Sequence, residues 1–412
     1  MLVGCSAQTD CGAGACCANY GLYSACVPTG CGVCPATTAS SSSGSTGSVA
    51  STGSSGSSTG GSNSSSSGGS SSGAPSGPIT GLTANQWTWV DFPDAYCRDG
   101  SATGIGVNPS PTSSDNVMIF LMGGGACFNA ETCPNNPSSF GSADLSTETG
   151  AVGIADRSDP NNPVADWNWV FVPYCTGDIH AGANMAGSVA GVSGTQKFVG
   201  YLDMQAYLAR IVPTYPNATE VLLTGVSAGG FGAALNYTQV ARAYPSATVD
   251  LIDDSGPFMK SPALASCLQQ EVTALWGLDS TVLADCGTHC NTTDFFLPYA
   301  EWVVGSYPNA RFGLIEDTDD ATITEFFGFG ASGCTGFAAE TATQFDAGLM
   351  DIRNGLASDS NFGTFYFAGT DHTSLAGSTF DSRSAPLVDG GTMVLSTWTT
   401  DLVNGTPDTV GP

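Results

Sequence analysis

Residues 219–235, TEVLLTGVSAGGFGAAL, place a serine between glycines where a strand gives way to a helix. Residues 221–223 are a short apolar run of strand composition, and residues 230–235 have the composition of an opening helix. Between them, Gly225-Val226-Ser227-Ala228-Gly229 fits the pattern G-x-S-x-G. A turn this tight holds the serine hydroxyl above the sheet and points the next backbone N–H at an oxyanion. The flanking strand and helix favour a nucleophile elbow over a chance Gly-rich turn with a capping serine.

Short apolar runs alternate with helical segments through most of the chain. We expect strands at 116–122, 168–173, 221–224, 249–252, 311–315 and 363–368. We expect helices at 197–210, 230–244, 263–276, 322–327 and 392–402. This alternation predicts an α/β fold with a doubly wound, mostly parallel sheet of the α/β-hydrolase type. Such sheets place their active sites at the carboxyl ends of the strands.

Charge is scarce and strongly acidic. The chain of 412 residues has 36 acidic and 9 basic residues, a net charge of −27. Nucleic acids and anionic membranes require basic patches, so the composition excludes both as partners. No run approaches the roughly 18 apolar residues of a membrane span. We expect a monomer that acts on a small or polymeric substrate.

The 15 cysteines form two groups. Seven lie before residue 35 and eight beyond residue 90. The start, Met-Leu-Val-Gly-Cys, is similar to the tail of a bacterial lipoprotein signal, which makes Cys5 a candidate lipid-anchor residue. The other cysteines would then form three and four disulfides, as expected of an exported protein outside the cell or on its surface. Four residues cannot hold the apolar core of about 7–15 residues in a complete export signal, so an accidental likeness is an equal alternative.

Composition divides the chain into three parts. Residues 1–35 are rich in cysteine and poor in large apolar side chains, which predicts a small disulfide-stapled module. Residues 36–79 are almost wholly Ser, Gly and Thr and are expected to be a flexible linker. Residues 80–412 have a globular composition and are expected to form the α/β unit. The first part could bind or anchor, or act as a passive cap.

A serine hydrolase of this fold needs an acid and then a histidine after the nucleophile. The chain has three histidines, and His180 precedes Ser227. His289 lies between Cys286 and Cys290, where a small disulfide loop is favoured over a zinc site because the chain is expected to be exported. His372 follows the predicted strand 363–368, where a loop-borne general base belongs. We therefore predict His372 as the base.

The acid is expected after the preceding strand, 311–315. Glu316, Asp317, Asp319 and Asp320 all follow it, and their spacing alone does not choose among them. Asp320 lies nearest the next helix. The others are expected to belong to a solvated acidic turn, which is the usual fate of a run of charges.

A second oxyanion donor is expected from the loop after an earlier strand. Strand 116–122 ends in Gly123-Gly124-Gly125-Ala126-Cys127, where three glycines let backbone N–H groups approach a tetrahedral oxygen. Cys127 and Cys133 are close enough in sequence to close a small loop that fixes this turn.

Five motifs together resemble the pectinacetylesterase/Notum family of secreted α/β-hydrolase-fold carboxylesterases. They are GGGAC (123–127), PYCTGD (173–178), GVSAGG (225–230), the acidic turn ending at Asp320, and TDH (370–372). The resemblance implies Ser227 as nucleophile, Asp320 as acid and His372 as base. It also implies Gly125, Ala126 and Ala228 as oxyanion-hole donors, with no metal or organic cofactor. Ala126 departs from the family's usual tryptophan, which keeps the N–H but removes part of a pocket wall, and the acidic turn lacks the family's Tyr-Asp-x-x-Gln.

These features predict an exported serine carboxylic ester hydrolase. Removal of acetyl groups from a polysaccharide is the leading expectation. Cleavage of longer acyl chains or of other esters is an alternative within the same chemistry. A binding protein built on a decayed hydrolase scaffold is an alternative of another class, although the intact Ser-Asp-His order argues against decay.

Overall fold

The computed structural model describes residues 3–4, 15–19, 24–28, 77–291, 293–387 and 390–412. The strands of its main sheet are β4 (Thr88–Tyr96), β5 (Ala102–Asn108), β6 (Val117–Leu121), β7 (Asn168–Val172), β10 (Glu220–Val226), β11 (Thr248–Asp254), β12 (Phe312–Asp317), β13 (Phe362–Phe367) and β16 (Thr409–Val410). Two hairpins pair β8 (Asn184–Gly187) with β9 (Gln196–Phe198) and β14 (Ser384–Pro386) with β15 (Thr392–Val394). The helices are α1 (Leu145–Glu148), α2 (Gly200–Thr214), α3 (Ala228–Ala243), α4 (Ser266–Trp276), α5 (Val282–Cys286), α6 (Phe296–Ser306), α7 (Ala321–Gly328), α8 (Ala342–Gly355) and α9 (Leu395–Asn404).

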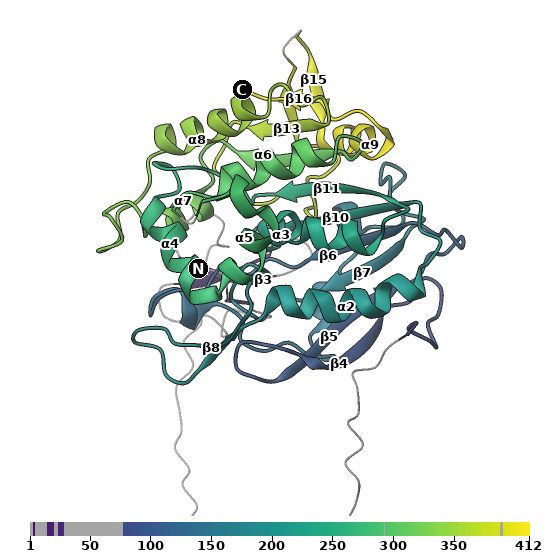
Figure 1. The fold of residues 1–412 in the computed structure, drawn as a ribbon. Coiled ribbons are helices and arrows are strands. Elements are labelled where there is room, and N and C mark those ends of the chain that lie inside the picture. The colour runs from purple at the N-terminus through teal and green to yellow at the C-terminus, as the bar shows by residue number, and fades with distance from the viewer. Residues whose placement is uncertain (1–2, 5–14, 20–23, 29–76, 292, 388–389) are drawn as a thin grey trace, which may run out of the picture.

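The main sheet has the strand order β16-β13-β12-β11-β10-β6-β7-β5-β4 (Figure 1). Every pair from β16 to β7 is parallel, whereas β5 pairs antiparallel with both β7 and β4. The predicted doubly wound, mostly parallel sheet is confirmed. All residues of β6 and β7 are buried, as expected for strands covered on both faces.

Helices cover both faces of this sheet. The ring of Phe312 lies 4.8 Å from that of Tyr237 on α3. A Cβ on the next residue, Gly313, would come within 2.5 Å of Trp398 and Leu402 on α9. Because successive residues of a strand face opposite ways, α3 and α9 lie on opposite faces. The core is therefore two apolar layers with the sheet between them.

The structure differs from the sequence prediction at element ends and in several elements that were not predicted. β12 runs to Asp317, two residues beyond the predicted strand, and α9 begins at Leu395 because residues 392–394 form β15. Helices α6 and α8 and strands β4 and β5 were not predicted. β4 contains Pro93 and pairs irregularly between Phe92 and Tyr96, so it lacks a regular strand pattern.

Four disulfides pair all eight cysteines beyond residue 90, as predicted. The pairs are Cys97–Cys175, Cys127–Cys133, Cys267–Cys334 and Cys286–Cys290. The zinc alternative for Cys286, His289 and Cys290 is wrong, because both thiols are in the same disulfide. Within the described ranges, no cluster of three or more His, Cys, Asp or Glu residues could hold a metal ion.

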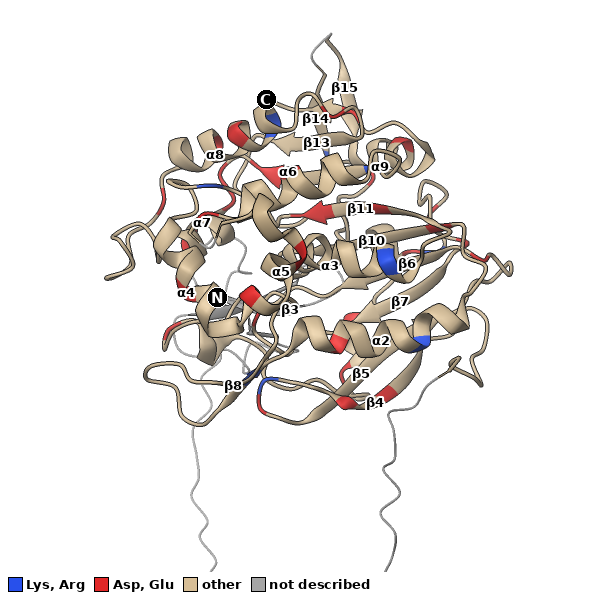
Figure 2. Cartoon of the chain, viewed as in Figure 1, with Lys and Arg blue, Asp and Glu red and all other residues tan. Residues whose placement is uncertain are grey.

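The N-terminal part contributes a small antiparallel sheet in the order β1-β3-β2, made of Val3–Gly4, Ser24–Pro28 and Ala15–Asn19. The disulfides predicted for this module, the lipid anchor at Cys5 and the linker up to residue 76 lie outside the described residues. None of the helices in the described part is long and apolar enough to cross a membrane. Figure 2 shows how few Lys and Arg residues accompany the acidic ones in the sheet and its helices.

Candidate active site

Ser227 occupies the sharp turn between β10 and α3. Its backbone has φ +58° and ψ −124°, a region that residues with a side chain rarely adopt. Steric crowding requires glycine at positions 225 and 229, on either side of this serine. A Cβ on Gly225 would lie 2.3 Å from the carbonyl oxygen of Gly229, and one on Gly229 would lie 2.0 Å from that of Leu121. The structure therefore forms the predicted elbow at this serine.

His372 and Asp320 form a buried pair, joined by His372 Nδ1 and Asp320 Oδ2 at 2.6 Å. Asp320 is also the N-cap of α7, where its Oδ1 accepts hydrogen bonds from the N–H groups of Thr322 (2.7 Å) and Ile323 (2.9 Å). These contacts hold the carboxylate in a fixed orientation facing the imidazole. With the proton on Nδ1 facing this carboxylate, the neutral imidazole carries its lone pair on Nε2.

The other acids of this turn do not all behave as predicted. Glu316 and Asp317 are the buried last residues of β12, so a solvated turn is the wrong description of both. Asp317 Oδ1 accepts a hydrogen bond from Arg383 Nη2 at 2.6 Å. Burial raises the pKa of Asp317 to about 6, with Arg383 opposing the rise. Burial, with the neighbouring Asp320 carboxylate adding to it, raises the pKa of Glu316 well above its usual range.

The remaining histidines are in structural positions. His180 is buried, with Nε2 2.9 Å from the carbonyl oxygen of Met122 and its ring 4.7 Å from that of Tyr174. Burial lowers the pKa of His180 to about 4. His289 is exposed within the Cys286–Cys290 loop, as the sequence predicts.

The glycine loop after β6 is fixed from several directions. Gly124 and Gly125 have φ of +150° and +76°, which few other residues adopt. Asn136 Nδ2 donates to the Gly124 carbonyl oxygen at 2.7 Å, and Trp276 Nε1 donates to that of Cys127 at 3.0 Å. The Cys127–Cys133 disulfide closes the loop, as predicted. These contacts hold Gly125 and Ala126 in place beside Ser227.

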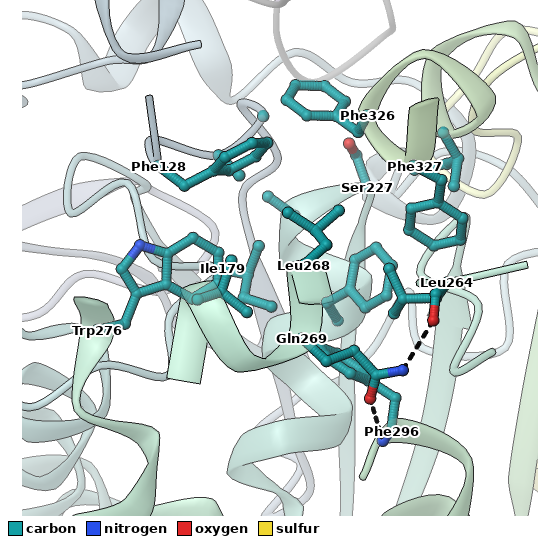
Figure 3. Close-up of a pocket in the computed structure, with 16 residues that line it drawn as sticks. Phe128, Ile179, Ser227, Leu264, Leu268, Gln269, Trp276, Phe296, Phe326 and Phe327 are labelled. Carbon is teal, nitrogen blue, oxygen red and sulfur yellow. Dashed lines mark hydrogen bonds between the residues drawn. The ribbon is translucent and has the colours of Figure 1, made fainter. Parts of the chain in front are cut away.

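A deep apolar pocket opens at Ser227 (Figure 3). Gly125, Ala126 and Ala228, the three predicted oxyanion donors, line it together with the serine. As the first residue of α3, Ala228 has an N–H that no helix carbonyl can accept. About 570 Å³ of space, part of it open to solvent, lies between its walls. Apart from Ser227 and Gln269, its walls are apolar and include Phe128, Ile179, Phe231, Leu264, Leu268, Val272, Trp276, Phe296, Ile323, Phe326 and Phe327.

Gln269 is a structural component of this wall. Its Nε2 donates to the Leu264 carbonyl oxygen (2.8 Å) and to Asp294 (2.7 Å), and its Oε1 accepts from the N–H of Phe295 (2.7 Å). These bonds fix α4 against the start of α6, as the dashed lines in Figure 3 partly show. The amide is therefore satisfied within the wall, and the pocket presents hydrocarbon to a ligand.

The elements of the site meet through α7. Asp320 caps this helix, and its residues Ile323, Phe326 and Phe327 line the pocket that contains Ser227. The predicted Asp320 and His372 are in direct contact, and the three predicted donors line the same pocket as the serine. The sequence interpretation missed α4 as a pocket wall and missed Asp254 and Ser255, which stand at the carboxyl end of β11. That position, the carboxyl end of a parallel strand, was the available signal.

Comparisons with known proteins identify relatives of this chain. A family model described as pectinacetylesterase matches residues 84–325. The palmitoleoyl-protein carboxylesterase NOTUM of Mus musculus is 33% identical over 176 residues, covering 40% of this chain and 34% of the relative. Its counterpart in Schmidtea mediterranea is 32% identical over 167 residues, covering 37% of this chain and 30% of the relative. The chain thus matches about a third of the length of these curated relatives.

Solved structures show the same fold. Two crystal forms of the Wnt deacylase Notum from Drosophila superpose with TM-scores of 0.57 and 0.53. The first is 21% identical and the alignment covers 77% of this chain and 92% of that one; the second is 19% identical, with 76% and 91% covered. At these identities the likeness establishes the fold.

Proposed function

The chain belongs to the pectinacetylesterase family of carboxylesterases, and on that basis we propose that it hydrolyses esters whose acyl group is longer than acetyl. The apolar pocket at Ser227 carries this proposal. An acetyl group would leave most of its eleven large apolar side chains without a partner. Each methylene buried there contributes about 0.8 kcal/mol. The relatives named palmitoleoyl-protein carboxylesterase also support an acyl group longer than acetyl.

In the proposed mechanism, Ser227 attacks the acyl carbonyl while His372 Nε2 takes the hydroxyl proton. Asp320 holds the imidazole with its proton on Nδ1 and stabilises the imidazolium that forms. The N–H groups of Gly125, Ala126 and Ala228 donate to the tetrahedral oxyanion. His372 returns the proton to the leaving alcohol, which leaves the acyl group on Ser227. Water then attacks this acyl-enzyme with His372 again as base, and the acid is released.

Acetyl removal from a polysaccharide, the leading expectation from sequence, is the second candidate. The pectinacetylesterase family match favours it. The net charge of −27 makes an anionic polymer such as pectin a poor encounter partner at low salt, so a neutral acetylated polymer is the better form of this candidate.

A chain-length series tests the proposal. p-Nitrophenyl acetate, butyrate, octanoate and palmitate are assayed with the wild type and with Ser227→Ala, and acetate release from acetylated xylan is measured in parallel. We expect kcat/KM to rise up to about fourfold per methylene from acetate to octanoate, because each buried methylene is worth about 0.8 kcal/mol. A maximum on acetate, together with acetate release from xylan, would replace the proposal by the second candidate. Absence of turnover on every ester would favour the binding-protein alternative.

A further inference from the structure

Asp254, the last residue of β11, contacts the segments that carry both Ser227 and His372. Its backbone carbonyl oxygen accepts a hydrogen bond from the N–H of Ser227 at 2.7 Å. Its side-chain Oδ2 accepts from the N–H groups of Ser374 (2.7 Å) and Leu375 (2.6 Å), two and three residues after His372. Asp254 is fully buried. One residue therefore fixes the nucleophile through its main chain and the histidine loop through its side chain.

Ser255 extends the same contact. Its Oγ accepts a hydrogen bond from the N–H of Thr373 at 3.0 Å and donates to Asp254 Oδ1 at 3.1 Å. The three consecutive N–H groups that follow His372 thus all bind the pair Asp254 and Ser255. Figure 2 shows the acidic tip of β11 that begins this pair.

The backbone at this junction is held in an uncommon conformation. Ser227, Ser255 and Thr373 have φ of +58°, +62° and +62°, in the left-handed region that favours glycine. Residues are retained there only where the surroundings over-determine the conformation. The hydrogen bonds around Asp254 and Ser255 provide that constraint, and they connect the three strained positions to one another.

We propose that Asp254 is a positioning residue, which with Ser255 sets the place of the His372 imidazole relative to the Ser227 hydroxyl. The inference rests on the proposed function for the roles of Ser227 and His372. Two charge-assisted bonds to buried N–H groups define the loop more tightly than neutral ones would. Burial raises the pKa of Asp254, while the N–H groups of Leu375 and Ser374 and the nearby His372 favour its charged form. A shift of about 1 Å at the base can cost about a hundredfold in rate.

The test compares Asp254→Asn and Ser255→Ala with Asp253→Asn as a matched control. Asp253 is the neighbouring buried carboxyl on the opposite face of β11, where it lines a separate cavity beside Phe258 and Tyr299. The first readout is the second-order rate at which a fluorophosphonate ester modifies Ser227, together with the fraction of protein modified. The second readout is the steady-state kinetics of unmodified protein on p-nitrophenyl octanoate. It gives KM and kcat, with kcat expressed per reactive serine as counted by the probe.

We expect the probe to modify Asp254→Asn to completion but about 10–100-fold more slowly than wild type. Its kcat per reactive serine should fall by the same factor, and its KM should stay within about twofold of the wild-type value. Ser255→Ala should lose roughly 3–10-fold, because one loop N–H loses its acceptor. Asp253→Asn should keep the wild-type rates. A merely structural role for Asp254 would lower the modified fraction and leave the rate per reactive site unchanged, and that result would overturn the inference.

If Asp254→Asn does not fold, Ser255→Ala decides, and a wild-type rate for it counts against the inference. The modification rate separates this inference from the proposed function, because it requires an activated serine but no ester turnover. Slower modification of the variants in a protein that hydrolyses no ester would reject the proposed function and keep the positioning role. Wild-type protein that does not react with the probe would reject both.

Discussion

His372 and Asp320 are in contact across 52 residues of sequence, and the Asp320 carboxylate divides its two oxygens between two tasks. Oδ1 caps α7 by accepting the N–H groups of Thr322 and Ile323, while Oδ2 meets His372 Nδ1. The position of the imidazole is therefore tied to the start of a helix whose side chains line the apolar pocket at Ser227. We therefore expect a substitution at Asp320 to affect the tautomer of His372 more than the shape of the pocket.

Asp320→Asn should lower kcat by about 10⁴, as expected for loss of a triad acid. The asparagine amide can keep the helix cap with its oxygen, but its NH₂ would face Nδ1 and favour the wrong imidazole tautomer. Ester hydrolysis and thermal unfolding measured together check this, with Asp319→Asn on the adjacent, more exposed residue as control. If Asp319→Asn were the inactive variant, the assignment of the acid would be wrong.

Ser227→Ala should lose on the order of 10⁴–10⁶ in kcat with little loss of stability. The elbow is shaped by Gly225 and Gly229 rather than by the hydroxyl, so the fold does not depend on Oγ. p-Nitrophenyl octanoate hydrolysis measures the loss, and circular dichroism confirms the fold. Retention of more than a tenth of wild-type activity would place the nucleophile elsewhere.

Features set by local sequence were predictable. The elbow, the glycine loop with Cys127 and Cys133, and the six main strands each follow from residues within a short window. Chain order and strand-end position selected His372, which the structure places in contact with Asp320. The choice of Asp320 came from its place beside the next helix and from the resemblance, and the structure puts it at the N-cap.

Features set by distant contacts were not predictable. Asp317 looks like part of a solvated acidic run, but Arg383, 66 residues later, pairs with it in a buried position. The pocket walls include α4 and α7, and the disulfide between Cys267 and Cys334 joins α4 to the segment that follows α7, across 67 residues. Burial of Asp254 likewise depends on the return of the chain after β13. No single window of sequence contains these pairs.

Leu268→Trp should shorten the acyl chain that the enzyme accepts. Leu268 projects from α4 into the pocket (Figure 3), and a larger ring there would exclude the outer part of the chain. Loss of three buried methylenes at about 0.8 kcal/mol each predicts a roughly fiftyfold fall in kcat/KM on octanoate and little change on acetate. Gln270→Trp, on the exposed side of α4, is the control. Equal losses on both esters would mean that the acyl group binds elsewhere.

Removal of the Cys267–Cys334 disulfide by paired serine substitutions should cost about 4 kcal/mol of unfolding free energy, because it closes a loop with a sequence separation of 67. The same change at Cys286 and Cys290, separated by 4, should cost only about 2 kcal/mol. Urea unfolding of the two variants compares these values directly. Similar costs for the two disulfides would show that loop closure does not set their contribution.

Alkylation of native protein without reductant, followed by mass spectrometry, should label none of the eight cysteines beyond residue 90.

His180 should make stability fall in acid. Burial lowers its pKa in the folded protein to about 4 from 6.5, so between these values the unfolded chain binds a proton that the folded protein does not. The unfolding free energy therefore rises with pH across this window, and about 3 kcal/mol present above pH 6.5 is lost as the pH falls to about 4. His180→Gln keeps a donor for the Met122 carbonyl oxygen but does not titrate.

The measurement is the difference in unfolding free energy between wild type and His180→Gln, by urea titration at about pH 7 and about pH 4.5. We expect the wild-type advantage to shrink by about 2–3 kcal/mol at the lower pH. Buried acids whose pKa is raised, such as Asp203 and Asp253, change stability in the opposite direction, but they do so in both proteins and cancel in the difference. His289→Gln, at the exposed histidine, should leave the wild-type slope in place. Parallel pH profiles for wild type and His180→Gln would mean that the buried imidazole gains its proton without unfolding, and the assignment of acid sensitivity to His180 would fail.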